Sequence, residues 1–190
     1  GELARAALEY GFEQYGIDIL MRYYDLISRN GETYLWYFPD GRPSSVETST
    51  SPEAKPTDGW GSSAMLYAFV EGLAGIQDKD KLFRRVRLCP KWISAGVEKA
   101  EVKIDYKSSG AFVKYAYSHT HDKLIINLAG SYDYIQLSLP VPGNYAAGDL
   151  MIGGKKKKYI MASINQSSYL IADADVKGEC EIILELRKKP

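Results

Sequence analysis

The sequence has no excess of charge of either sign, almost no cysteine or histidine, and no long apolar run. Lys and Arg together number 24, as do Asp and Glu, so no overall field favours binding to a polyanion. No apolar stretch approaches the roughly 18–20 residues that a membrane-spanning helix needs. We therefore expect a soluble globular protein whose partners include neither nucleic acid nor a membrane.

Tyrosine, by contrast, is abundant: the chain has 15 Tyr beside 3 Trp and 5 Phe. An aromatic ring with a polar tip packs well in β-sheets, and it also suits surfaces that contact sugars. The composition alone leaves both uses open.

The first third of the chain has the periodicity of helices. Residues 2–10 favour a helix that ends at Gly11, and residues 13–29 favour a second helix that stops at Asn30-Gly31. A third helix is expected over residues 62–74, capped by Ser62 or Ser63. Its apolar face is expected to hold the following side chains: Leu66, Phe69, Val70 and Leu73.

A long irregular loop, residues 31–61, separates the second and third predicted helices. A loop of this length without regular structure is usually functional or mobile. The chain also begins inside a helical pattern, and residues 2–10 are too charged for a signal peptide. We therefore expect a portion of a longer protein, and the sequence predicts no compartment for it.

From Phe83 onward the apolar residues alternate with a period of two, which indicates strands. Eight short strands are expected, near residues 86–88, 102–106, 112–115, 124–128, 134–139, 159–164, 169–172 and 179–186. Short strands with turn signals between them are typical of an antiparallel β-sandwich. The sequence thus predicts an α+β fold, with a helical segment at 1–80 followed by a sandwich at 81–190.

Cys89 and Cys180 fall in the first and last predicted strands, so they could form a disulfide or remain two buried thiols. His119-Thr120-His121-Asp122 lacks the distant third ligand that a metal site needs, and we expect neither a metal nor a cofactor. Lys155 to Lys158 are expected at a solvated hairpin tip.

Three motifs occur in order along the chain. They are YLWYFPDG at 34–41, DGWGSSA at 58–64 running on to VEGLAGI at 70–76, and FRRVRLCP at 83–90. This order resembles the C-terminal region of six-hairpin glycosidases, including rhamnosidase, α-glucosidase and disaccharide-phosphorylase relatives. The resemblance implies that the helices are the last of an α/α toroid and that a sandwich follows them. Several relatives carry a catalytic glutamate where this chain has Leu35.

The loop holds residue types that a sugar site needs. Glycoside cleavage uses one protonated and one ionised carboxyl, with aromatic faces around the sugar. The loop offers the carboxyl groups of Glu47, Glu53 and Asp58, of which Glu47 and Asp58 are the candidate catalytic residues. The expected sugar contacts are these aromatic residues: Trp36, Tyr37 and Trp60.

Two functions remain open from the sequence. In the first, the chain is the C-terminal part of a glycoside hydrolase acting on an oligo- or polysaccharide. Three helices cannot close a toroid of about a dozen, so this chain is expected to be inactive alone. Its partners would be carbohydrate and either the rest of the catalytic domain or a second copy, bound through the helices. In the second, it is a stand-alone carbohydrate-binding or structural module.

Overall fold

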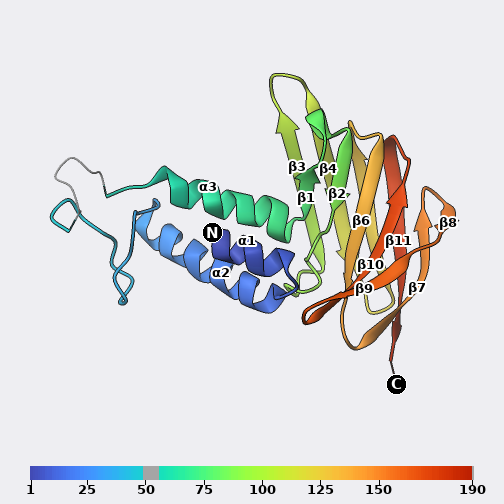
Figure 1. Cartoon of the computed structure of the whole chain (residues 1–190), viewed down its shortest axis with the longest axis horizontal. Coiled ribbons are helices and arrows are strands. Elements are labelled where there is room, and N and C mark those ends of the chain that lie inside the picture. Colours follow the sequence, from blue (N-terminus) through green and yellow to red (C-terminus); the bar gives the residue numbers. More distant parts are fainter. Residues whose placement is uncertain (49–55, 190) are drawn as a thin grey trace.

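The computed structural model describes residues 1–48 and 56–189, in which helices precede two β-sheets (Figure 1). The expected α+β class, helices followed by a β-sandwich, is confirmed. The helical elements are α1 (Glu2–Glu9), α2 (Glu13–Asn30), α3 (Gly59–Tyr67), the π-helix η1 (Ala68–Leu73) that continues α3, and the short 3-10 helix η2 (Lys81–Phe83).

The first two helices end at the glycines that the sequence predicted. Gly11 has a φ of 77°, and the Phe12 amide donates to the carbonyl of Ala7 over 2.9 Å, as in a Schellman motif. Gly31 is left-handed, with a φ of 75°. These caps satisfy backbone carbonyls that the helices would otherwise leave without donors.

The predicted apolar face of the third helix is only partly buried. Leu73 is buried, but Leu66 and Phe69 are 63% and 40% exposed. The helix instead turns its small residues toward α1, where a Cβ added at Gly72 would lie 2.7 Å from a methyl carbon of Leu8. The face that packs against α1 carries small residues, because close packing of the two helices requires them.

The described strands form a five-stranded and a six-stranded sheet. The first has the order β1-β2-β6-β10-β9 and the second β3-β4-β5-β11-β7-β8, and all neighbours are antiparallel except β2 and β6. The strands are β1 (Ile76–Asp78), β2 (Arg85–Leu88), β3 (Lys99–Tyr106), β4 (Ala111–His119), β5 (Lys123–Gly130), β6 (Tyr134–Val141), β7 (Tyr145–Ile152), β8 (Lys155–Lys157), β9 (Ile160–Ile164), β10 (Ser167–Ala174) and β11 (Gly178–Lys188).

The eight predicted strands are all present, but the sequence missed β1, β7 and β8. Of the lysines expected at a hairpin tip, Lys155–Lys157 form β8 and Lys158 follows it, and the turn before them is Gly153-Gly154. Lys156 pairs with Asp149 of β7 over 2.7 Å. Lysines along a sheet edge discourage pairing with another chain, which suits this position.

The core fills the space between the two sheets. Its fully buried members include Leu88 and Leu137 from the five-stranded sheet, with Ile126 and Ile182 from the six-stranded one. Both cysteines are free and buried, so the interpretation as two thiols is confirmed.

A buried carboxylate joins the helices to the sandwich. Glu13, at the start of α2, is 5% exposed and accepts hydrogen bonds from the hydroxyls of Ser167 and Tyr169 in β10. The Asn165 side-chain amide also donates to the carbonyl of Tyr10 over 2.7 Å. The helices are therefore attached to the sandwich at the turn between α1 and α2.

The end of η1 is held by a second set of contacts. The buried Lys91 ammonium donates to the carbonyl of Gly72 over 2.9 Å. The Trp92 indole donates to the Tyr115 hydroxyl, which donates to the carbonyl of Ala74, both over 2.7 Å. Cations and N–H donors at a helix C-terminus satisfy its last carbonyls, so these contacts fix where the helix meets the sheets.

Three buried tyrosines make the fold sensitive to alkali. Burial raises the pKa of Tyr115, Tyr117 and Tyr132 well above the usual value of about 10. The unfolded chain releases these protons at lower pH than the folded chain, so the stability present at neutral pH is lost as pH rises above about 10. The expected loss is roughly 1.4 kcal/mol per pH unit for each tyrosine.

Urea unfolding between pH 8 and 11, followed together with tyrosinate absorbance, measures this effect. Exposed tyrosines should titrate first, while Tyr115, Tyr117 and Tyr132 ionise only as the chain unfolds. Ionisation of every tyrosine near pH 10 with no loss of stability would contradict the assignment.

Candidate functional site

The two ends of the 31–61 loop are hydrogen-bonded to each other beside the ends of α2 and α3. The Asp58 amide donates to the carbonyl of Thr33 over 2.9 Å, and the Leu35 amide donates to that of Pro56 over 2.8 Å. Tyr34 and Thr57 form an isolated antiparallel bridge. These contacts place the loop at the end of the helices away from the sandwich (Figure 1).

The loop aromatics that were expected to contact sugar have different surroundings. Tyr37 packs edge-on against Tyr23 and Tyr34, with ring centroids 6.5 and 5.9 Å away, and is half-buried. Trp36 is half-buried against Phe38, with centroids 4.5 Å apart.

Trp60, in the first turn of α3, is 81% exposed. Its ring has the free surface that stacking on a pyranose requires, while Trp36 and Tyr37 can present only part of theirs.

Asp58 is the N-cap of α3. Its two carboxylate oxygens accept the amides of Trp60 and Gly61, each over 2.9 Å. The prediction that Ser62 or Ser63 caps this helix is wrong, because the helix begins at Gly59, before either serine, and their hydroxyls instead donate to its carbonyl. A capping carboxylate is held in one orientation by the backbone it satisfies.

Glu47 is exposed, and a hydrogen bond from the Ser45 side chain lowers the pKa of its carboxyl. A general acid needs the opposite shift, since it must keep its proton at the working pH. Glu47 therefore suits an ionised role. Glu53 lies outside the described residues, and position 35, where several relatives have a catalytic glutamate, holds an exposed leucine here.

No group of three or more His, Cys, Asp or Glu side chains in residues 1–48 and 56–189 is arranged to hold a metal ion. His119 instead lies 3.2 Å from the Tyr117 hydroxyl, and Asp122 accepts the Thr120 hydroxyl over 2.6 Å. Within those ranges no helix is long and apolar enough to cross a bilayer.

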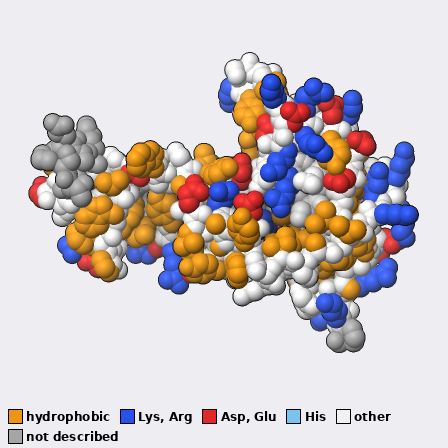
Figure 2. All heavy atoms as spheres, viewed as in Figure 1, with side chains coloured by type: hydrophobic (Ala, Val, Ile, Leu, Met, Phe, Trp, Pro, Cys, Tyr) orange, Lys and Arg blue, Asp and Glu red, His pale blue; other side chains and the backbone are white. Residues whose placement is uncertain are grey.

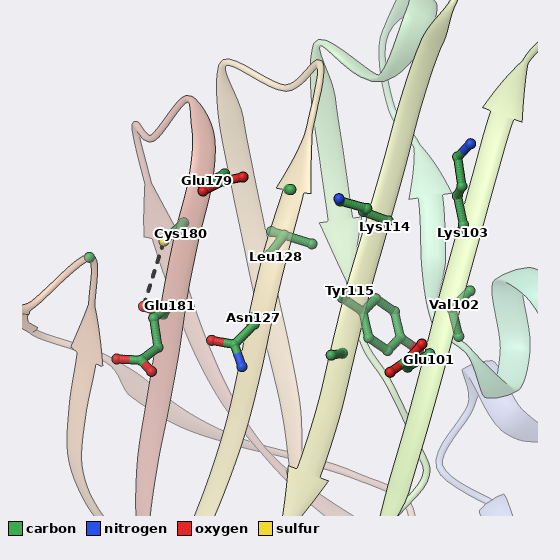
Figure 3. A pocket seen from close by; sticks show the side chains of 13 residues that line it. Glu101, Val102, Lys103, Lys114, Tyr115, Asn127, Leu128, Glu179, Cys180 and Glu181 are labelled. Atoms are coloured by element: carbon green, nitrogen blue, oxygen red, sulfur yellow. Dashed lines mark hydrogen bonds between the residues drawn. The ribbon is translucent and has the colours of Figure 1, made fainter.

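The sequence analysis missed a groove on the outer face of the six-stranded sheet (Figure 3). Its charged side chains include Glu101 and Lys103 of β3, and Glu179 and Glu181 of β11. In the sequence these residues occupy the polar positions of predicted strands in which polar and apolar residues alternate. The sequence could not show that β11 lies beside β5, so it could not bring them together.

Comparisons with known proteins find distant structural similarity only. No protein-family model and no curated protein matches the sequence. Among the solved structures, an α-L-rhamnosidase from Dictyoglumus thermophilum is 12% identical, with a TM-score of 0.45 over 70% of this chain and 15% of that chain. A GH127 β-L-arabinofuranosidase from Geobacillus Stearothermophilus T6 is 16% identical, with a TM-score of 0.39 over 66% and 18%.

Both neighbours are glycoside hydrolases, and this chain spans less than a fifth of the length of either. At these identities and TM-scores the similarity assigns neither a family nor a substrate to the chain.

Proposed function

We propose that this chain is the C-terminal part of a glycoside hydrolase that acts on an oligo- or polysaccharide. In this proposal residues 1–80 are the last helices of an α/α toroid, and residues 81–190 are the sandwich that follows. The ordered motifs at 34–41, 58–76 and 83–90 support it. The observation that carries it is the apolar surface that the helices leave exposed.

Large apolar side chains are unevenly exposed along the chain. Of the sixteen in the described residues, twelve belong to residues 1–80. Figure 2 shows hydrophobic side chains on the surface of the helices and also over part of the sandwich. We use the term exposed helical surface for six of them, which lie on more than one face of α1, α2, α3 and η1: Leu3, Tyr15, Met21, Tyr24, Leu66 and Phe69.

Large apolar side chains exposed in this number on neighbouring helices mark surfaces for interaction with a partner. The helices that carry them are attached to the sandwich through contacts that include those of Glu13 and Lys91. Further helices of the same catalytic domain are the partner that such a surface fits. Apolar stripes on neighbouring helices pack against each other, as in any helical assembly.

The second candidate is a stand-alone carbohydrate-binding or structural module. It is favoured by the completeness of the sandwich, whose two sheets enclose a core without help from another chain. The two candidates differ in the exposed helical surface, which a stand-alone module has no reason to keep.

The isolated chain is expected not to hydrolyse glycosides. A glycosidase needs two carboxyl groups about 5 to 10 Å apart across the scissile bond, one of them protonated. Asp58 caps a helix, and Glu47 is suited to the ionised role. Incubation of the isolated chain with a panel of aryl glycosides tests this expectation. Turnover by wild type that disappears in Glu47→Gln or Asp58→Asn would overturn the expected inactivity. Asparagine also caps helices well, so Asp58→Asn should keep the fold.

The loop is expected to provide whatever sugar affinity the helical end has. Trp60→Ala should remove the exposed stacking face, and Trp36→Ala should remove a smaller, half-buried one. Calorimetric titration with cellotetraose and xylotetraose, with circular dichroism as a check on folding, measures the effect. Sugar binding to the helical end that survives both substitutions would show that the loop does not contact the sugar.

A further inference from the structure

A groove of about 860 Å³ crosses strands β3, β4, β5 and β11 on the outer face of the six-stranded sheet (Figure 3). Strand pairing aligns its outward side chains in two rows. One row consists of Glu101, Ala116, Asn127 and Glu181. The other row consists of Lys103, Lys114, Ala129 and Glu179. The groove is within the usual range of ligand sites, roughly 300–1,000 Å³.

The floor of the groove is formed by two alanines. Ala116 of β4 pairs with Asn127, and Ala129 lies two residues further along β5, so the two alanines are diagonal neighbours. Alanine is uncommon in strands, where larger side chains normally cover the sheet. Beneath this floor Tyr115 and Leu128 point into the packed core, which makes it rigid.

The charged groups around this floor are not paired with each other. In the described part of the chain, none of the side chains of Glu101, Lys103, Lys114, Glu179 or Glu181 forms an ion pair or a hydrogen bond. Lys103 and Lys114 are even directly opposite each other, an arrangement that destabilises a sheet. These groups are therefore free to interact with a ligand.

We infer that this groove binds a neutral glycan segment lying across the strands. Three carboxylates and two ammonium groups line the groove together, so neither a polyanion nor a polycation fits the whole surface. Sugar hydroxyls can donate to carboxylates and accept from lysine, and the Asn127 amide does both. The site is separate from the 31–61 loop, and only the choice of a glycan rests on the proposed function.

Titration of the isotopically labelled chain with three tetrasaccharides of different charge tests the inference. Cellotetraose is neutral, tetragalacturonate is anionic, and the glucosamine tetramer is cationic. Cellotetraose is expected to shift the amide signals of Ala116, Ala129 and Gly153. Tetragalacturonate and the glucosamine tetramer should shift them less.

Ala116→Phe fills the groove without removing a charge, and it should weaken cellotetraose binding at least about tenfold. Phenylalanine is favourable in strands, so this variant should fold. Lys123→Gln changes a charge on the same strand as Asn127 but outside the groove, and it should bind as wild type does.

Three results would overturn the inference: no shift at the groove with cellotetraose, shifts with one charged tetramer only, or undiminished binding by Ala116→Phe. Groove binding that persists in Trp36→Ala and Trp60→Ala would support this site, whatever the outcome for the loop.

Discussion

Replacing Gly75 with alanine is expected to prevent stable folding. Gly75 lies between η1 and β1 with a φ of 70°, and an added Cβ would be 2.0 Å from the carbonyl oxygen of Cys89 and 2.1 Å from its carbonyl carbon. Both are backbone atoms next to β2, so they cannot move aside without breaking the attachment of the helix to the sheet. The expected loss in the free energy of unfolding is about 4 kcal/mol or more.

Gly96→Ala is the matched control for this substitution. Gly96 has nearly the same φ, 68°, but no atom lies within 4 Å of the added carbon. Gly96→Ala should therefore lower the free energy of unfolding only by the cost of placing alanine in the left-handed conformation, about 1–2 kcal/mol. Urea denaturation of both variants measures the difference. Equal destabilisation would mean that backbone conformation, and not the contact with Cys89, requires glycine at position 75.

The second large effect is expected from Glu13→Ala. This change leaves the buried Tyr169 hydroxyl without its acceptor, while the Ser167 hydroxyl loses the carboxylate and keeps the carbonyl of Gly11, 3.1 Å away. Hydrogen bonds to a charged group contribute roughly 1.5–3 kcal/mol each, so the loss should be about 3 kcal/mol or more. Amide exchange should rise first in α1 and α2, because their attachment to β10 is what the change removes.

Gln14→Ala is the control for Glu13→Ala, because it removes a neighbouring but exposed hydrogen bond to the carbonyl of Ser94. It is expected to cost about 1 kcal/mol. The loss in the free energy of unfolding for Tyr169→Phe should lie between those of the two variants, since this change removes one of the two donors to Glu13. If Glu13→Ala and Gln14→Ala were equally stable, the buried carboxylate would not be what joins the helices to the sandwich.

The sequence predicted those elements whose signals are local. Helices α1 and α2 were found within a residue or two, because Gly11 and Gly31 end them through their own backbone conformation. The start of α3 was missed, because Gly59 and Gly61 are poor helix formers that Asp58 stabilises by capping.

Strands without a clear alternation were missed. β7 contains Ala146, Ala147 and Gly148, which have low strand propensity, and β8 is three lysines. Both become strands through pairing, β7 with β11 and β8 with β7. Contacts between distant parts of the chain, which a sequence pattern does not contain, determine these elements.

The candidate site was predictable in its residue types but not in its geometry. The sequence identified Trp60 and Asp58, yet only the structure shows that one is exposed and the other caps a helix. The Glu13 attachment and the outer-face groove each join segments far apart in the chain, and no local signal marks them. Leu66 was expected on the apolar face of the third helix, and the structure shows that it is exposed.

Sedimentation velocity over a range of concentrations tests the central claim, that the exposed helical surface is an interface for further helices. Wild type, lacking that partner, should self-associate as concentration rises and should bind a hydrophobic dye. A variant with Met21→Lys, Tyr24→Lys and Leu66→Lys should remain monomeric with unchanged circular dichroism, since all three side chains are more than half exposed. A wild-type chain that stays monomeric and binds no dye would contradict the claim.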